Sequence, residues 1–202
     1  RVVTYLPDGS QSLAFFDYAD RLWVLFPHQG QNSTVCFADH PDDSFECYAV
    51  PVAARHLVVD RTNTLHLIDE YGFYAEIDDT GMLVSNVPLL YAGNGMLAVD
   101  SARNLYLVSA SYGYVRLRYR PVGRDWTDPV ALAKWSGIGA PQIFVDAEDN
   151  LLLVFEPSSG IPATMRSFSP QVKASALSQV IAIPAGLHKP TLSFDYTLRG
   201  AV

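Results

Sequence analysis

Five aspartates divide the chain into units of 40 to 49 residues. Each stands at the end of a short apolar run and four or five residues before a second apolar run; they are Asp17, Asp60, Asp100, Asp146 and Asp195. Repeats of this length, with strand-like segments separated by turns, are typical of a β-propeller, in which each repeat forms one blade. The sequence therefore predicts an all-β fold built from four-stranded blades.

Each repeat opens with a hairpin, because the apolar run before the aspartate and the run after it are separated only by a short turn. The hairpins start near residues 13, 56, 96, 142 and 191. Two further apolar segments follow each complete hairpin and supply the third and fourth strands of a blade. Five such units predict about five blades in a single propeller domain over residues 1–202.

The aspartates have a structural explanation. A carboxylate at the start of a turn accepts hydrogen bonds from backbone N–H groups a few residues later, which forms an Asx turn. Three residues further on, Asp20, Asn63 and Asp149 suit a left-handed backbone, whereas Arg103 and Leu198 suit it less well. We interpret the five acids as structural turn residues, one per blade, and not as a catalytic or metal site.

The two ends of the chain align with each other. Residues 2–17 superpose without a gap on residues 180–195, so residues 2–5 match the fourth strand of a blade. A ring closed by pairing of this N-terminal strand with the last blade would leave no exposed sheet edge. The alternative is a piece of a larger propeller. Because the chain begins with Arg1 rather than Met, we expect that it was excised from a longer protein.

Composition narrows the classes of partner. The net charge is −7 and the pI is about 5.0, which argues against nucleic-acid binding, since phosphate recognition relies on clustered Lys and Arg. No apolar stretch is long enough for a membrane-spanning helix. The one basic cluster is Arg116, Arg118, Arg120 and Arg124, and its alternation favours one face of a solvated outer strand over an anion site.

Cys36 and Cys47 are the only cysteines, and both fall in the first repeat. If they lie on opposite strands of a hairpin around residues 40–43, they can form a disulfide. Two small buried thiols are the alternative. The cellular localisation is therefore unknown from the sequence.

Two segments resemble known propeller repeats. VDSARNLYLV (99–108) resembles the NHL-type repeat, although Arg103 stands where that repeat has glycine, as does Asp149 in the next unit. The segments 117–132 and 140–155 resemble repeats of sialidase-like propellers, but only Asp125 and Trp126 remain of the characteristic box of those families. The resemblance implies a propeller and carries over no functional residue, because propellers serve many functions.

In a propeller, the loops between second and third strands and the loops that enter the next blade form the usual binding face. Here these loops contain eight candidate ligand-binding residues, namely His28, Arg55, His56, Tyr71, Tyr112, Trp135, His188 and Lys189. The aromatic side chains could stack on a sugar or anchor a protein, and Trp135 could instead pack between blades. No two of the histidines have ligand spacing, so we predict neither a metal nor a cofactor.

Glu70 and Glu156 end equivalent strands two repeats apart and are candidates for a catalytic carboxylate pair. No other catalytic motif occurs. The sequence therefore favours a non-catalytic recognition module that binds a macromolecule or a glycan through its loop face. The alternatives are a sialidase-like, glycan-processing hydrolase with a carboxylate pair at the channel mouth, and a structural scaffold.

Overall fold

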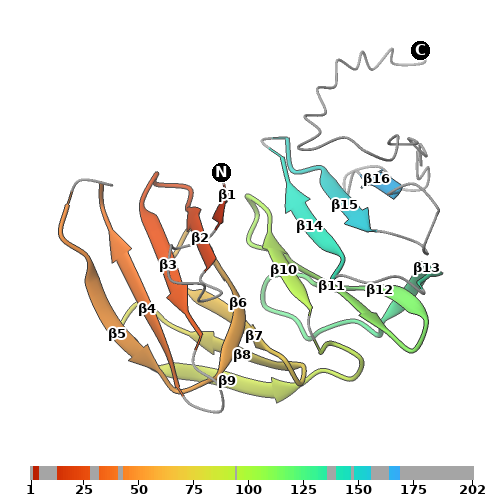
Figure 1. Cartoon of the computed structure of the whole chain (residues 1–202), viewed down its shortest axis with the longest axis horizontal. Coiled ribbons are helices and arrows are strands. Elements are labelled where there is room, and N and C mark those ends of the chain that lie inside the picture. Colours follow the sequence, from red (N-terminus) through yellow and green to blue (C-terminus); the bar gives the residue numbers. More distant parts are fainter. Residues whose placement is uncertain are drawn as a thin grey trace.

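The computed structural model describes residues 2–4, 13–27, 32–40, 43–93, 95–135, 140–146, 148–155 and 164–168. These residues form four antiparallel sheets and no helix, so the described part of the chain has no helix that could cross a membrane. Figure 1 shows the sheets following one another along an arc. In this part of the chain, the arc does not close into a ring.

Each sheet is a meander whose strands pair in chain order. The first contains β1 (Val2–Thr4), β2 (Leu13–Phe16), β3 (Leu22–Phe26), β4 (Ser33–Ala38) and β5 (Glu46–Val50). The second contains β6 (Ala54–Val59), β7 (Leu65–Asp69), β8 (Phe73–Ile77) and β9 (Leu83–Pro88). The third contains β10 (Met96–Val99), β11 (Leu105–Ser111), β12 (Tyr114–Arg120) and β13 (Val130–Lys134). The fourth contains β14 (Gln142–Val145), β15 (Leu151–Phe155) and β16 (Thr164–Phe168).

Burial follows the position of a strand in its sheet. The second strands β3, β7, β11 and β15 are largely buried, which explains their nearly continuous apolar sequences. The outer strands β9 and β13 are mostly exposed. Apolar side chains fill the space between each pair of adjacent sheets, with Leu67, Leu107 and Leu153 among the fully buried ones. The sheets therefore pack face to face.

The N-terminal strand is part of the first sheet. β1 pairs with β2 in antiparallel register, with Val2 opposite Phe15 and Thr4 opposite Leu13. The last repeat, with which the sequence predicted its pairing, lies outside the described residues, so ring closure is not confirmed. Only eight residues separate β1 from β2, so this local hairpin closes a short loop at a small entropic cost. The first sheet consequently has five strands.

The four described aspartates lie at the turns that join first and second strands. In each turn the carboxylate accepts backbone hydrogen bonds, as in the bonds of 2.8 Å from Thr62 N and 3.1 Å from Thr64 N to Asp60 Oδ1. The third residue after the aspartate has a positive φ in all four turns: 60° at Asp20, 61° at Asn63, 67° at Arg103 and 63° at Asp149. Arg103 therefore also has a left-handed backbone, although arginine suits this conformation less well than Asp or Asn. Asp195 and Leu198 lie outside the described residues.

The same left-handed positions connect neighbouring repeats. Asn63 accepts a hydrogen bond from Arg21 of the first repeat, and Asp149 accepts one of 2.8 Å from the backbone of Ser101 in the third repeat. Arg103 donates to Asp60 in the second repeat at 2.8 Å. At each step, a residue of one turn therefore binds the turn of the preceding repeat.

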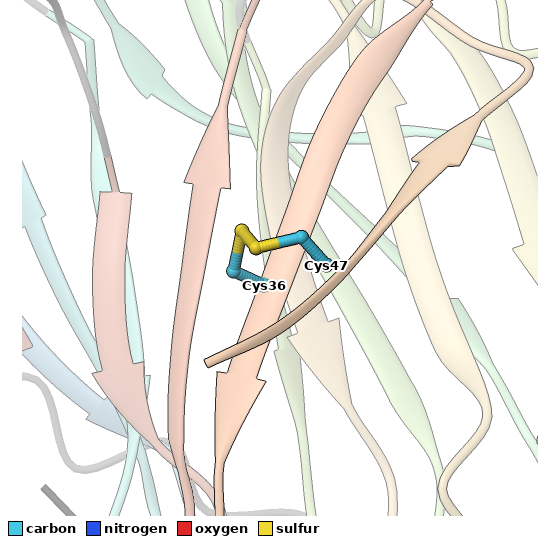
Figure 2. The surroundings of a disulfide bond; sticks show 2 residues. All are labelled: Cys36 and Cys47. Atoms are coloured by element: carbon cyan, nitrogen blue, oxygen red, sulfur yellow. A yellow bond between two sulfur atoms is a disulfide. The ribbon is translucent and has the colours of Figure 1, made fainter. Parts of the chain in front are cut away.

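Cys36 and Cys47 form a disulfide between β4 and β5, as Figure 2 shows. The two residues lie directly opposite each other in the register of the two strands. Of the two possibilities that the sequence left open, the structure has the bridge. The bond attaches the outer strand β5 to the rest of its sheet.

Candidate recognition surface

The loops opposite the aspartate turns form one continuous surface in the second and third repeats. They are the β7–β8 turn (70–72), the β11–β12 turn (112–113) and the β9–β10 connection (89–95). Leu89 N donates to Gly72 O at 2.8 Å, and Ser109 Oγ donates to Tyr91 O at 2.7 Å. The connection is thereby fixed to both neighbouring repeats.

Gly72 makes this contact possible. Its φ is +92°, and a Cβ atom at this position would lie 2.9 Å from the carbonyl oxygen of Leu89. Any side chain would therefore clash with the connection as well as strain the turn. The close approach of the β7–β8 turn to the connection requires glycine here.

Tyrosines dominate the exposed side chains of these loops. Tyr112 is 80% exposed and Tyr71 is 74% exposed, while Tyr91 and Tyr114 are 37% and 39% exposed. Leu90, which precedes Tyr91 in the β9–β10 connection, is 67% exposed. We call these five residues together with Arg116 the tyrosine surface. Aromatic groups that remain this accessible contribute little to a core, so burial within the chain does not explain them.

Two of these tyrosines have an unusual backbone conformation. Tyr91 has a φ of +67° and Tyr112 one of +49°, in the left-handed region that bulky residues rarely adopt. Each costs about 1 kcal/mol relative to an ordinary backbone. Their rings meet edge to face with centroids 5.5 Å apart. Both are turn positions: Tyr112 and Gly113 are the central residues of the β11–β12 hairpin, and Tyr91 is the third residue of the turn closed by Ala92 N and Leu89 O.

Arg116 lies beneath the rings. Its guanidinium stacks 4.7 Å from the centroid of Tyr91 and 5.3 Å from that of Tyr114. Its Nη1 donates to the carbonyl oxygen and to the hydroxyl of Ser111. The two cation–π contacts and these hydrogen bonds restrict the orientation of the guanidinium. Arg116 is thus half-buried and not a solvated side chain of an outer strand, because β12 is the third strand of its sheet.

The other two arginines of β12 are also engaged. Arg118 donates to Leu90 O at 2.7 Å and so supports the β9–β10 connection from below. Arg120 reaches the second repeat, where it donates to Glu76 at 2.7 Å and to the Tyr74 hydroxyl at 2.6 Å. The alternation of the three arginines therefore places two of them at the recognition end of β12 and the third between repeats.

Glu70 and Arg55 form an ion pair beside Tyr71. Arg55 Nη2 donates to Glu70 Oε2 at 2.8 Å, and both side chains are about one third exposed, at 31% and 33%. The hydrogen bond from Arg55 lowers the pKa of Glu70. Glu70 therefore stays ionised at neutral pH, whereas a catalytic acid needs a raised pKa. Glu156 lies outside the described residues, so the proposed carboxylate pair is not tested.

His56 points into a different environment. With residues from β2, β6, β10 and β14, it lines a cavity of about 750 Å³ on the inner side of the arc. Its Nδ1 accepts a hydrogen bond of 3.2 Å from Leu97 N. Burial lowers the pKa of His56 to about 4, so the ring is neutral at physiological pH. The structure thus separates His56 from the tyrosines.

A polar cluster lies between the second and third repeats. His66 Nδ1 and the Tyr74 hydroxyl are hydrogen-bonded at 2.7 Å, and Arg120 and Glu76 complete the cluster. His66 Nε2 has no hydrogen-bond partner in the described structure and lies 3.5 Å from Asp60 Oδ2, next to a cavity of about 50 Å³. Within the residues that the structure describes, no group of His, Cys, Asp and Glu could hold a metal ion.

No protein-family model and no curated protein sequence matches the chain. Among solved structures, a catalytically inactive virginiamycin B lyase from Staphylococcus aureus, solved with quinupristin, is similar over 86% of this chain and 74% of its own, with a TM-score of 0.50 and 10% identity. The fold of that lyase is a β-propeller. This chain has a β-propeller-type fold.

A second solved structure, a post-proline cleaving enzyme from Rickettsia typhi, is similar over 84% of this chain but only 29% of its own, with a TM-score of 0.49 and 12% identity. At such low identities, similarity to the lyase concerns the propeller fold alone. Neither comparison bears on the NHL-type or sialidase-like resemblance, which therefore stays a prediction.

The propeller brings some of the sequence candidates together. Arg55 forms the ion pair with Glu70, and Tyr71 lies beside this pair. Tyr112 contacts Tyr91. Trp135 is partly buried against the core between the third and fourth sheets. His28, His188 and Lys189 lie outside the described residues. The sequence did not mark Tyr91 or Tyr114 as candidates, and Arg116 was interpreted there as a residue of a solvated outer strand; Gly113, between Tyr112 and Tyr114, was the available signal for a tight turn.

Proposed function

We propose that this chain is a non-catalytic recognition module that binds another macromolecule or a glycan through the tyrosine surface. The observation that carries the proposal is the exposure of the Tyr71 and Tyr112 side chains, at 74% and 80%, in loops at the same end of the propeller. The turns account for the left-handed backbone of Tyr91 and Tyr112, but core packing gives no reason for large aromatic rings that remain in solvent.

The composition of the loops supports the proposal. Residues 70–73, 89–95 and 109–114 consist mainly of Tyr, Ser, Gly, Leu and Ala, and they connect strands of packed sheets. Tyrosines with small neighbours are also typical of antibody paratopes, because a tyrosine offers a large contact area at a low cost in side-chain entropy. Rigid strands that hold such loops give a preformed binding surface.

The alternatives have less support. A glycan-processing hydrolase would need a carboxyl group able to donate a proton, and the ion pair with Arg55 works against that role for Glu70. A structural scaffold explains the backbone of Tyr91 and Tyr112, which occupy turn positions, but offers no reason for aromatic side chains as exposed as Tyr71 and Tyr112. We therefore favour a recognition module over both the hydrolase and the scaffold.

The proposal also includes the complete propeller. We infer from the aligned repeats that the hairpin near residue 191 forms a fifth blade of a single domain. Closure of the ring would then require residues 2–4 to leave β2 and pair with that blade. An experimental structure of the full chain tests this point, and persistence of the β1–β2 pairing beside a complete fifth blade would rule out this closure.

The binding proposal can be tested without a known partner. The purified chain would be used to select ligands from a peptide display library and from a glycan array. We expect Tyr112→Gly combined with Tyr71→Ala to weaken the selected ligand by at least about tenfold, as for a hot spot. Met82→Ala, which removes a side chain that is 68% exposed on the outer side of the second sheet, is the matched control. If the wild type, the double variant and Met82→Ala all bind the selected ligand with equal affinity, the proposal is refuted.

A further inference from the structure

We propose that the partner of the tyrosine surface is an acidic segment of another protein, with a carboxylate bound at Arg116. This inference rests on the proposed recognition function and specifies its ligand. It is based on the charges around the tyrosines, where positive side chains lack an acidic partner among the described residues, whereas the whole chain has a net charge of −7.

The acidic groups at the recognition end are already engaged. Asp69 Oδ1 accepts hydrogen bonds from the backbone of Tyr71 and Phe73, and Glu70 is paired with Arg55. Arg116 and Lys134 have no ion-pair partner within the part of the chain that the structure describes. Lys134 lies opposite Tyr114 in the β12–β13 register, next to the same surface. An uncompensated positive charge on a chain of net charge −7 favours an acidic partner at this end.

The geometry of Arg116 suits a carboxylate. Only its Nη1 atom is engaged, at Ser111, so Nε and Nη2 have no hydrogen-bond partner among the described residues. The ring contacts with Tyr91 and Tyr114 have already restricted the side chain, so binding would cost little further rotamer entropy. A planar guanidinium fixed in this way can bind the two oxygens of a carboxylate.

Apolar contacts favour a protein over an acidic sugar. Leu90 is 67% exposed and Phe73 is 44% exposed beside the tyrosines. Protein interfaces are rich in Tyr, Phe and Arg, with apolar groups at the centre and charges at the rim. The tyrosine surface has both components, with the exposed Leu90 directly before Tyr91 in the β9–β10 connection and Lys134 opposite Tyr114.

The experiment uses the intact chain and display libraries of short peptides in matched acidic, neutral and basic sets, together with oligogalacturonate as an acidic sugar. We expect selection from the acidic set, binding that weakens as salt rises, and a loss of about tenfold or more in Arg116→Gln. Lys134→Gln, which changes an exposed charge without touching the stacked rings, should weaken binding less but in the same direction. Arg124→Gln, in the exposed β12–β13 turn at the other end of β12, is the charge-matched control and should bind as the wild type does.

The outcomes separate the two proposals. Selection of neutral or basic peptides, preference for oligogalacturonate, or wild-type affinity in both Arg116→Gln and Lys134→Gln would overturn the acidic partner. If Tyr112→Gly still weakens such a ligand, recognition through the tyrosines survives and only its specificity is wrong. If Tyr112→Gly has no effect either, the proposed function fails together with this inference.

Discussion

Arg103 donates its Nε proton to Asp60 Oδ2 over 2.8 Å, which joins the turn of the third repeat to that of the second. Arg103 occupies a left-handed position that glycine would fill at less cost, with φ at +67°. The ion pair explains why arginine is found there. Burial alone would raise the pKa of Asp60, but His66, Thr62 and Arg103 together lower it. Asp60 is therefore a charged, buried connection between two repeats.

This arrangement predicts unequal costs for equivalent substitutions. Asp60 is 2% exposed and Asp146 is exposed, although both begin the same kind of turn. Asp60→Ala would remove the buried acceptor of hydrogen bonds from Thr62, Thr64 and Arg103, so we expect a loss of about 3 kcal/mol in the free energy of unfolding. Asp146→Ala should cost about 1 kcal/mol, as for the loss of a turn bond. Urea denaturation of the two variants measures both values, and equal losses would contradict the interpretation.

The strain at Tyr112 predicts that its removal is tolerated. In Tyr112→Gly, the relief of the left-handed backbone should offset the lost ring contact with Tyr91, so stability should stay within about 0.5 kcal/mol of the wild type. Tyr114→Gly is the control, because Tyr114 lies in the regular strand β12. There we expect a loss of about 1 kcal/mol. A large loss in Tyr112→Gly alone would mean that Tyr112 serves the fold.

His56 predicts a pH dependence of stability. Its pKa in the folded protein, about 4, lies below the value of about 6.5 in an unfolded chain. The contribution of the neutral ring is therefore complete above about pH 6.5 and decreases as the pH falls toward 4. Because the ring is partly exposed, we expect a loss of about 1 to 2 kcal/mol.

The measurement compares the wild type with His56→Asn, which keeps an acceptor for Leu97 N, by chemical denaturation between pH 7 and pH 4. The variant should lose less stability over this range than the wild type. Parallel curves for the two proteins would show that His56 titrates normally.

The disulfide predicts sensitivity to reduction. Cys36 and Cys47 close a short loop, with a sequence separation of 11. Its loss should lower the free energy of unfolding by about 2 to 3 kcal/mol. Reduction of the wild type should have this effect, whereas the Cys36→Ser, Cys47→Ser variant should start lower and not respond to the reductant. If reduction leaves the wild type unchanged, the bond adds nothing to stability.

Local signals predicted the strands well. The hairpin starts near residues 13, 56, 96 and 142 match β2, β6, β10 and β14, because apolar runs around an Asx turn are defined within a few residues. Pairing between distant segments was harder. The alignment of the chain ends suggested a last-blade partner for the N-terminal strand but did not indicate its pairing with β2, because an alignment does not weigh the low entropic cost of a short hairpin. The last repeat lies outside the described residues, so its pairing with this strand stays a prediction.

The candidate surface was only partly predictable for a similar reason. The loop positions of Tyr71 and Tyr112 followed from the strand pattern. The left-handed backbone of Tyr91 and the stacking of Arg116 depend on contacts between the β9–β10 connection and β11 and β12, which no single segment encodes. The same holds for Arg103, whose unfavourable backbone is compensated by Asp60 of another repeat.

A partner bound at the tyrosine end of the propeller would protect the backbone amides of its loops. Amide hydrogen exchange of the chain, measured with and without a selected ligand, tests for this binding. We expect protection within residues 70–73, 89–93 and 110–116, and none in the aspartate turns at residues 60–64 and 100–104, which lie at the opposite ends of β7 and β11. Protection confined to the aspartate turns, or to the outer strand β9, would contradict the account.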